Sequence, residues 1–191
     1  MNLIFFDITE QPIIVQRNLN MEDKYDLTNL RKKPKRKNSR TKGSTFERQI
    51  AKALNDRFGT TEFSRSPGSG AFATTHTLPD YLKIYGDLIT PKNFKFCIEC
   101  KKGYNNLNLY SLYNHSSEFW KFIEQCEKDS GKCNKLPLLI FKQDRQPALA
   151  IMPGDINIPE EPQHINIHKN KTYKVYLFDE LIKCWDSMWF D

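Results

Sequence analysis

The sequence lacks any long hydrophobic run. No stretch reaches the roughly 18 to 20 apolar residues that a membrane-spanning helix requires. The opening residues, Met1–Asp7, contain no basic residue and include an acidic one, so we expect no signal peptide. These absences predict a cytoplasmic protein with no membrane partner.

Cysteine is scarce as well. The 191 residues contain five, an odd number without dense spacing, which favours reduced thiols over a disulfide framework. Cys97 and Cys100 have the spacing of a zinc knuckle. If they lie in one strand they point to opposite faces, whereas a knuckle needs a turn between its ligands, so a zinc site is disfavoured.

Positive charge is concentrated in one segment. Residues 31–42 hold eight of the 29 Lys and Arg residues and no acid, which leaves 21 basic against 23 acidic residues in the rest of the chain. Such a run cannot bury itself, and it could bind nucleic acid by neutralising phosphates. A solubilising linker or a nuclear-import-like cluster would have the same composition.

A first helix is predicted from about Gly43 to Phe58. Apolar residues recur at helical spacing, and Gly59 follows them. Ser44 and Glu47 have the spacing of a capping box at its start. Glu47 therefore has two open interpretations, a helix cap or an acidic group at the rim of the apolar stripe.

A glycine-containing loop follows the predicted strand Thr61–Arg65. Residues 66–70 read Ser-Pro-Gly-Ser-Gly, and glycines of this kind allow a phosphate to approach the backbone closely. Arg65 and Ser69 could donate to that phosphate. No Gly-Lys-Ser/Thr follows, so this is not a nucleotide-binding loop, and no small-molecule cofactor is expected. A plain turn is the alternative.

A β-hairpin is predicted over residues 86–102, with a turn-like cluster at 90–93. Its second segment alternates apolar and polar residues, the period of a strand with two distinct faces. Glu99 and Lys101 therefore point the same way, and the neighbouring strand brings Asp87 close. Two carboxylates suit Mg²⁺ or Mn²⁺, and an adjacent lysine can orient water or stabilise negative charge. An amphipathic hairpin with a surface salt bridge is the alternative.

The remaining elements complete an α/β pattern. We expect a second helix from Ser117 with a broad apolar side, a buried strand over 135–142, strands over 147–152 and 173–177, an irregular excursion over 153–172, and a last helix over 178–188 that buries Leu181, Ile182, Cys184 and Trp185. This order predicts a mixed central β-sheet flanked by helices.

Four short motifs occur along the chain in a fixed order: Lys42-Gly43-Ser44 with Glu47-Arg48, Arg65-Ser66 with Gly68-Ser69-Gly70, Gly86-Asp87, and Ile98-Glu99-Cys100-Lys101. Together they resemble the archaeal-type Holliday junction resolvases, within the PD-(D/E)xK nuclease superfamily, and related phage endonucleases. The resemblance covers about residues 42–142. It implies a restriction-endonuclease-like core, a Mg²⁺ cofactor for which Mn²⁺ can substitute, and a homodimer acting on DNA.

The resemblance also implies roles for individual residues. Asp87 and Glu99 would bind the metal, Glu47 would complete the acidic site, and Lys101 would assist the attacking water. An acidic site repels DNA, so cations are needed around it. The candidate DNA-binding residues are Arg48, Arg65, Ser69, Lys102, Lys33, Lys35 and Arg36.

The chain departs from the family pattern in two places. Positions 71–86 make a longer insertion than the pattern has, and Asp80 within it is a rival to Asp87; we prefer Asp87 because it adjoins the strand of Glu99. The additions at both ends divide the chain into a basic extension (1–42), a nuclease core (43–152) and a C-terminal extension packed on the core (153–191).

These features predict a metal-dependent DNA endonuclease, acting on branched DNA as a Holliday junction resolvase would, in recombination or repair. A phage-encoded enzyme acting in the host cytoplasm fits this expectation. A nuclease on duplex, nicked or single-stranded DNA is the first alternative. A DNA-binding module on a nuclease-like fold, without catalysis, is the second.

Overall fold

The computed structural model describes residues 39–67, 85–114 and 117–191, which belong to a compact unit extending from Lys37 to Asp191. In chain order the elements are α1 (Ser39–Phe58), β1 (Ser64–Arg65), β2 (Leu88–Ile89), β3 (Phe96–Lys102), the 3-10 helix η3 (Leu109–Leu112), α3 (Glu118–Cys133), β4 (Leu136–Lys142), β5 (Leu149–Pro153), β6 (His164–His168), β7 (Lys171–Leu177), α4 (Phe178–Leu181) and α5 (Asp186–Trp189).

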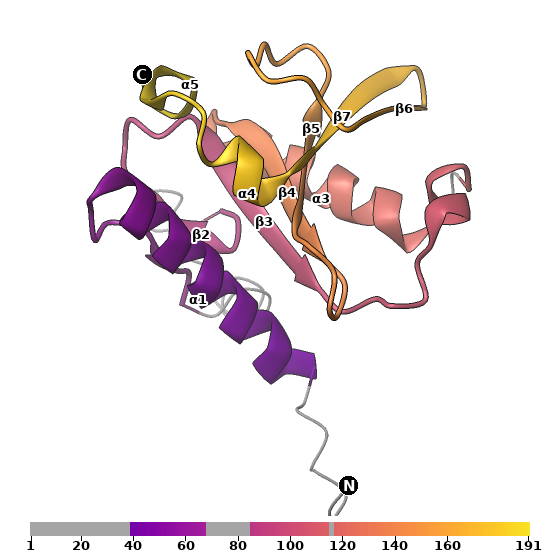
Figure 1. Cartoon of the computed structure of the whole chain (residues 1–191), viewed down its shortest axis with the longest axis horizontal. Coiled ribbons are helices and arrows are strands. Elements are labelled where there is room, and N and C mark those ends of the chain that lie inside the picture. Colours follow the sequence, from indigo (N-terminus) through magenta and orange to yellow (C-terminus); the bar gives the residue numbers. More distant parts are fainter. Residues whose placement is uncertain (1–38, 68–84, 115–116) are drawn as a thin grey trace, which may run out of the picture. The chain divides into compact units, whose positions relative to one another are not determined.

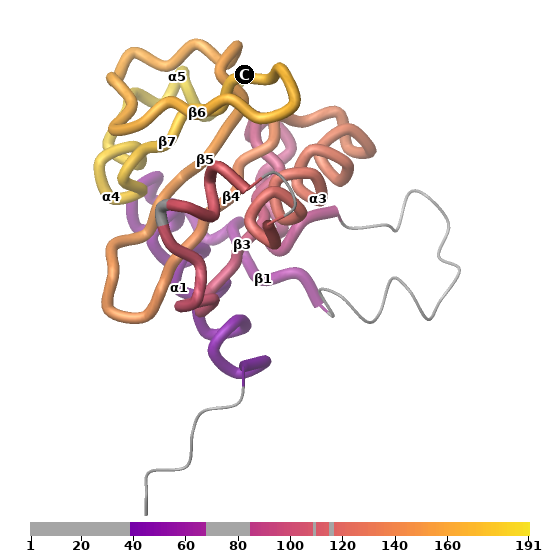
Figure 2. The backbone as a smooth tube through the Cα atoms, turned by 90° about the vertical axis from the view of Figure 1, so that its right-hand side faces the viewer, coloured from indigo at the N-terminus to yellow at the C-terminus, as the bar shows by residue number. Residues whose placement is uncertain are grey.

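Five of the strands form a mixed sheet in the order β3-β4-β5-β7-β6. β3 and β4 run parallel and are joined through α3, while the other neighbours are antiparallel. Figure 1 and Figure 2 show α1 and α3 on opposite sides of β3. The predicted α/β fold with a restriction-endonuclease-like core is therefore confirmed.

Helix α3 forms where the sequence predicts it. Ser117 is its N-cap, and Asn134 ends it in the left-handed conformation with φ 53°. Its apolar side chains are buried on the sheet: Phe119, Trp120, Phe122, Ile123 and Cys126. The aromatic residues of this helix are thus core residues.

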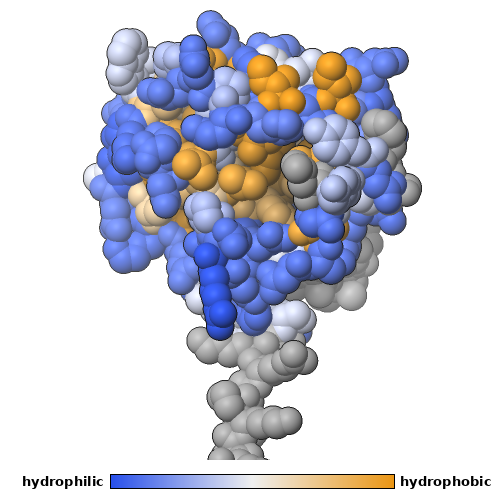
Figure 3. Space-filling view, turned by 45° about the vertical axis from the view of Figure 1, so that its right-hand side comes forward, coloured by the Kyte–Doolittle hydropathy of each residue, from blue (hydrophilic) through white to orange (hydrophobic). Residues whose placement is uncertain are grey.

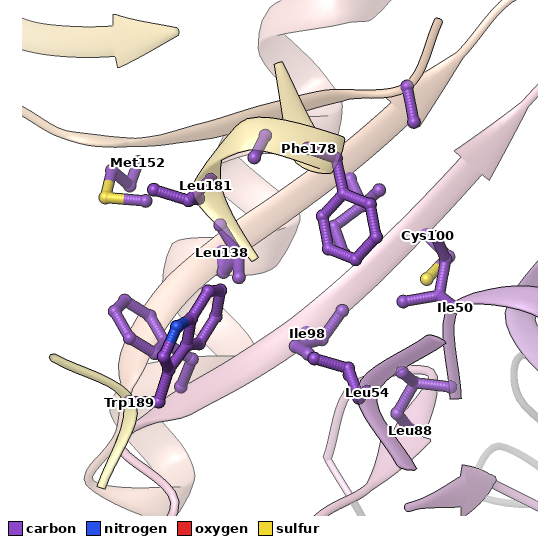
Figure 4. Close-up of a cluster of buried hydrophobic side chains, with 14 of the residues drawn as sticks. Ile50, Leu54, Leu88, Ile98, Cys100, Leu138, Met152, Phe178, Leu181 and Trp189 are labelled. Carbon is purple, nitrogen blue, oxygen red and sulfur yellow. The ribbon is translucent and has the colours of Figure 1, made fainter. Parts of the chain in front are cut away.

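The opposite face of the sheet carries the larger core, drawn in Figure 4. Ile50 and Leu54 of α1 pack there against Ile98 of β3, and residues near the C-terminus close the cluster. Trp189 is fully buried, with its ring centroid 5.8 Å from that of Phe94. The space-filling view of Figure 3 shows hydrophobic surface in limited patches framed by polar residues.

The start of the first helix differs from the prediction. Helix α1 already includes Ser39, so it extends into the basic run, and Ser44 lies inside it. The Ser44 hydroxyl donates to the carbonyl of Thr41, 3.3 Å away, as side chains within helices do. The predicted capping box is wrong, because Ser-x-x-Glu spacing also occurs within a helix.

The predicted hairpin is wrong because β2 does not pair with β3, although Asp87 does lie beside β3 as predicted. β2 pairs with β1, in the register Arg65 to Leu88. Asp87 nevertheless lies against β3, because its N–H donates to the Ile98 carbonyl at 2.8 Å.

Two predictions in the last third of the chain are wrong. The expected excursion over 153–172 contains β6, which pairs with β7 along its whole length. The expected helix over 178–188 is two short helices, α4 and α5. Trp185, which was expected to be buried, is 75% exposed, and Trp189 fills the core instead.

No helix within residues 39–67, 85–114 and 117–191 is long and apolar enough to cross a membrane.

The absence of a side chain at Gly86 lets Asp87 lie close to β3, and a substitution at Gly86 tests this. Its φ is +77°, and a Cβ there would lie 2.7 Å from the Ile98 carbonyl oxygen. We expect Gly86→Ala to lower the free energy of unfolding by about 1–3 kcal/mol, measured by urea denaturation. Gly131→Ala, in α3 with nothing within 4 Å of the added methyl, should raise it by about 0.5–1 kcal/mol. A Gly86→Ala protein as stable as wild type would contradict this account.

Candidate active site

A cleft of about 730 Å³ lies at the C-terminal half of β3. The residues that line it come from α1, the segment before β2, β3, the segment after β3, α3 and the loop after β4. They are Ser39, Arg40, Lys42, Gly43, Glu47, Asp87, Glu99, Cys100, Lys101, Lys102, Gly103, Tyr104, Asn105, Gln125 and Asp144. All four residues predicted to be catalytic are in this set.

Asp87 is positioned by the backbone of β3. Its carboxylate accepts a hydrogen bond from the Cys100 N–H at 2.8 Å, while its own N–H donates to Ile98. Burial raises the pKa of Asp87 to about 7, helped by the negative charges of Glu99 and Glu47 and only partly opposed by the Cys100 N–H and by Lys101. Asp87 is therefore a buried acid beside two other carboxylates, and its charged form is disfavoured in the metal-free protein.

Glu99 and Lys101 form an ion pair on the same side of β3. Burial raises the pKa of Glu99, and Lys101 opposes the shift. Burial alone would lower the pKa of Lys101, but the charge of Glu99 and its hydrogen bond raise it, so the ammonium stays charged. Lys101 also donates to the Gln125 side-chain oxygen at 3.2 Å and lies over the Phe122 ring. These contacts fix its direction.

Glu47 reaches the cleft from α1. It is only 7% exposed and forms an ion pair with Arg65 of β1. A buried carboxylate needs such a partner, because an unpaired buried charge is strongly unfavourable. Glu47 is therefore an acidic group of the cleft, not a helix cap.

The donors of the cleft suit a hard divalent cation. Among the described residues, no three His, Cys, Asp or Glu side chains are close enough to form a complete metal cage. Mg²⁺ does not require one, because it keeps several waters and uses one or two carboxylates together with substrate phosphates. Asp87 and Glu99 supply that number of carboxylates. Burial, together with the negative charges of Glu99 and Glu47, raises the pKa of Asp87, and a bound cation would favour its charged form.

The predicted DNA-binding residues differ in where they lie relative to the cleft. Lys102 lines the cleft, with its ammonium over the Phe46 ring. Arg48 is exposed on α1 and donates to the Ser44 carbonyl, and neither it nor Arg65 lines the cleft. The other predicted positions lie outside the described residues: Ser69, Lys33, Lys35, Arg36 and the rival acid Asp80.

Several cleft residues were not predicted individually. Arg40 and Lys42 belong to the basic run, and the continuation of α1 to Ser39 brings them to the cleft. Lys42 pairs with Asp144 at 2.9 Å, and Asn105 donates to the same carboxylate at 3.1 Å. Lys42 and Asp144 are 102 residues apart in sequence, so no local spacing signals their contact.

The fold and the site define a nuclease of the PD-(D/E)xK class. A family model described as "Phage putative PDDEXK endonuclease" matches residues 38–188, and the chain belongs to that family. The match includes the whole cleft and the strands and helices that follow it.

The chain is also similar to Protein D14 of Escherichia phage T5. The two are 38% identical over 113 residues, which cover 56% of this chain and 66% of that protein. The chain thus matches slightly less than two thirds of its relative. No solved structure was found to match.

The raised pKa of Asp87 predicts a pH dependence of stability in metal-free protein. The folded state holds a proton on Asp87 up to about pH 7, whereas the unfolded chain releases it near the ordinary aspartate pKa of 3.8. Stability from this group is therefore full below about pH 4 and is lost as pH rises to 7. We expect Asp87→Asn to abolish that loss, so that in EDTA at pH 7.5 the variant is more stable than wild type by on the order of 2 kcal/mol.

Asp144 provides the control. Hydrogen bonds from Lys42 and Asn105 lower its pKa, so its contribution has the opposite sign and is lost as pH falls. Asp144→Asn should gain no stability near pH 7. If the curves of unfolding free energy against pH are parallel for wild type and Asp87→Asn, the pKa of Asp87 is not raised in the folded protein.

Proposed function

We propose that this nuclease is a metal-dependent DNA endonuclease that hydrolyses phosphodiesters in branched DNA. One observation carries the proposal: three buried carboxylates, Glu47, Asp87 and Glu99, line a single open cleft together with Lys101. Burying three acids is unfavourable unless cations or ligands compensate for it. The gathering of these acids in one open cleft supports catalysis over a structural role.

Each group has a role in this proposal. Asp87 and Glu99 would hold Mg²⁺ or Mn²⁺. The metal supplies a lowered water pKa and offsets charge on the phosphate. Lys101, directed by Glu99 and Gln125, would hold the attacking water by hydrogen bonding. Glu47, held by Arg65, would keep the acidic wall of the cleft in place.

The cations of the cleft support a DNA substrate. Arg40, Lys42 and Lys102 line the cleft beside the carboxylates and can draw phosphates toward an otherwise repulsive surface. Contacts to phosphates carry no sequence information, which fits recognition of DNA shape. Paired cuts in a branched substrate need two sites, so two copies of the chain are part of the proposal.

The test is cleavage of a labelled four-way junction beside a matched duplex, in Mg²⁺ or EDTA. We expect paired cuts in the junction that EDTA abolishes, and that Asp87→Asn and Glu99→Gln each reduce by about 100-fold or more. Both variants should bind the junction at least as tightly as wild type, because each removes a negative charge near the phosphates. Glu124→Gln, an exposed acid of α3 paired with Lys169, should cleave normally.

Each other outcome identifies a different function. Equal metal-dependent cutting of junction and duplex would keep the nuclease and reject the branched substrate. Binding without cutting by the wild-type protein would favour a non-catalytic module. Loss of folding in Glu99→Gln, seen by circular dichroism, would make Glu99 a structural residue.

The basic run before α1 gives a second prediction. We expect replacement of Lys33, Lys35 and Arg36 by glutamine to weaken junction binding and to reduce the slope of log affinity against log salt by about 2 to 3. Substitution is preferable to deletion of 31–42, which would remove the first turn of α1. A control that replaces Lys52, Lys132 and Lys183 with glutamine changes net charge equally. If both triple variants keep the wild-type slope, the run takes no part in binding.

A further inference from the structure

Among the described strands, β6 has an unpaired outer edge, and it carries exposed hydrophobic side chains. β6 is the last strand in the sheet order, so among the described residues β7 is its one strand neighbour. Ile165 is 55% exposed and Ile167 is 65% exposed. Of six large hydrophobic residues exposed in the described part of the chain, two therefore lie on this five-residue strand. Proteins usually protect such an edge with charges, proline or a bulge.

The turn after β6 determines which backbone groups face outward. Lys169 and Asn170 both have positive φ, 47° and 64°, as in a two-residue type I′ turn, and the flanking residues His168 and Lys171 pair. In such a hairpin the flanking pair is hydrogen-bonded, and the pattern alternates along the strand. The N–H and C=O groups of His164, Asn166 and His168 thus face β7, while those of Ile165 and Ile167 face the open edge.

The sequence of β6 is a palindrome. It reads His-Ile-Asn-Ile-His over residues 164–168. If a second copy of the strand runs antiparallel about a two-fold axis at Asn166, each Ile165 faces Ile167 of the partner subunit. Their outward backbone groups are then in phase to form hydrogen-bonded pairs, and all four isoleucines lie on one face of the sheet.

We propose that two copies of this chain associate through β6, antiparallel and two-fold symmetric about Asn166. Moving the axis to Ile165 or Ile167 keeps the hydrogen-bond phase but places only one isoleucine opposite its own copy. Backbone and hydrophobic complementarity therefore agree on one register.

The pairing would make a continuous ten-stranded sheet with a β3 strand at each end. Nine strand spacings of about 4.8 Å then separate the two β3 strands, roughly 40 Å in all. The two clefts would lie far apart, on separate segments of any DNA bound to both. The interface itself does not depend on the reaction, so it can be tested without a cleavage assay.

The experiment measures the molar mass of the full-length chain by sedimentation equilibrium over a wide range of concentration. We expect a wild-type dimer and a twofold lower mass for Ile165→Lys and for Ile167→Glu, because each single change places a charge opposite an isoleucine. The double variant I165K/I167E should return to the dimer, because the introduced charges of opposite sign then face one another across the axis. Tyr110→Lys, at an exposed hydrophobic residue outside β6, should leave the dimer intact.

Two results would overturn the proposal. One is a wild-type protein that is monomeric at the highest soluble concentration. If such a protein dimerises only after residues 1–38 are removed, the partner of the β6 edge is that segment and not a second copy. The other is a dimer that persists in both single variants, which would place the interface elsewhere. A double variant that stays monomeric while remaining folded by circular dichroism would reject the register centred on Asn166.

Discussion

Two hydrogen bonds between Asp87 and the outer edge of β3 are the constraint on which the site depends. One runs from the Asp87 N–H to the Ile98 carbonyl, and the other from the Cys100 N–H to the Asp87 carboxylate. Together they let a loop residue occupy the place of a neighbouring strand residue. Glu99 lies between the two anchor points, so the spacing of the two carboxylates follows from backbone geometry. Gly86 makes the approach possible, since a side chain there would meet Ile98.

The cleft tolerates its buried acids through an uneven set of partners. Glu47 has Arg65, and Glu99 has Lys101, whereas Asp87 has a backbone N–H and the more distant Lys101. Two acids are thus held by ion pairs, while burial raises the pKa of the third, Asp87, to about 7. Because protonation and cation binding compete for the same oxygens, a metal would bind Asp87 more weakly at low pH.

Sequence patterns predicted those elements whose structure is determined by the residues of the element itself. β3, β4 and α3 have strong periodicity, and alternation along β3 placed Glu99 and Lys101 on one side. β6 was missed because its inward residues are His and Asn, which carry no hydrophobic signal. The first turn of α1 was missed because exposed basic residues suit a helix and a linker equally well. Cleft residues such as Asp144 arrive through tertiary contacts that no spacing encodes.

The position of Trp189 has a consequence for the order of events during synthesis. Every residue of the cleft has been made once the chain reaches Asp144, yet the core beneath β3 still lacks Trp189, which packs on Phe94 and Phe96. Arg57 of α1 likewise waits for its partners, the carbonyls of Ile182 and Cys184. A nascent chain on the ribosome thus carries the acids without the packing that orders them. The full site can assemble only after Trp189 has been made, and a chain interrupted after β7 would have the chemical groups of a nuclease without its geometry.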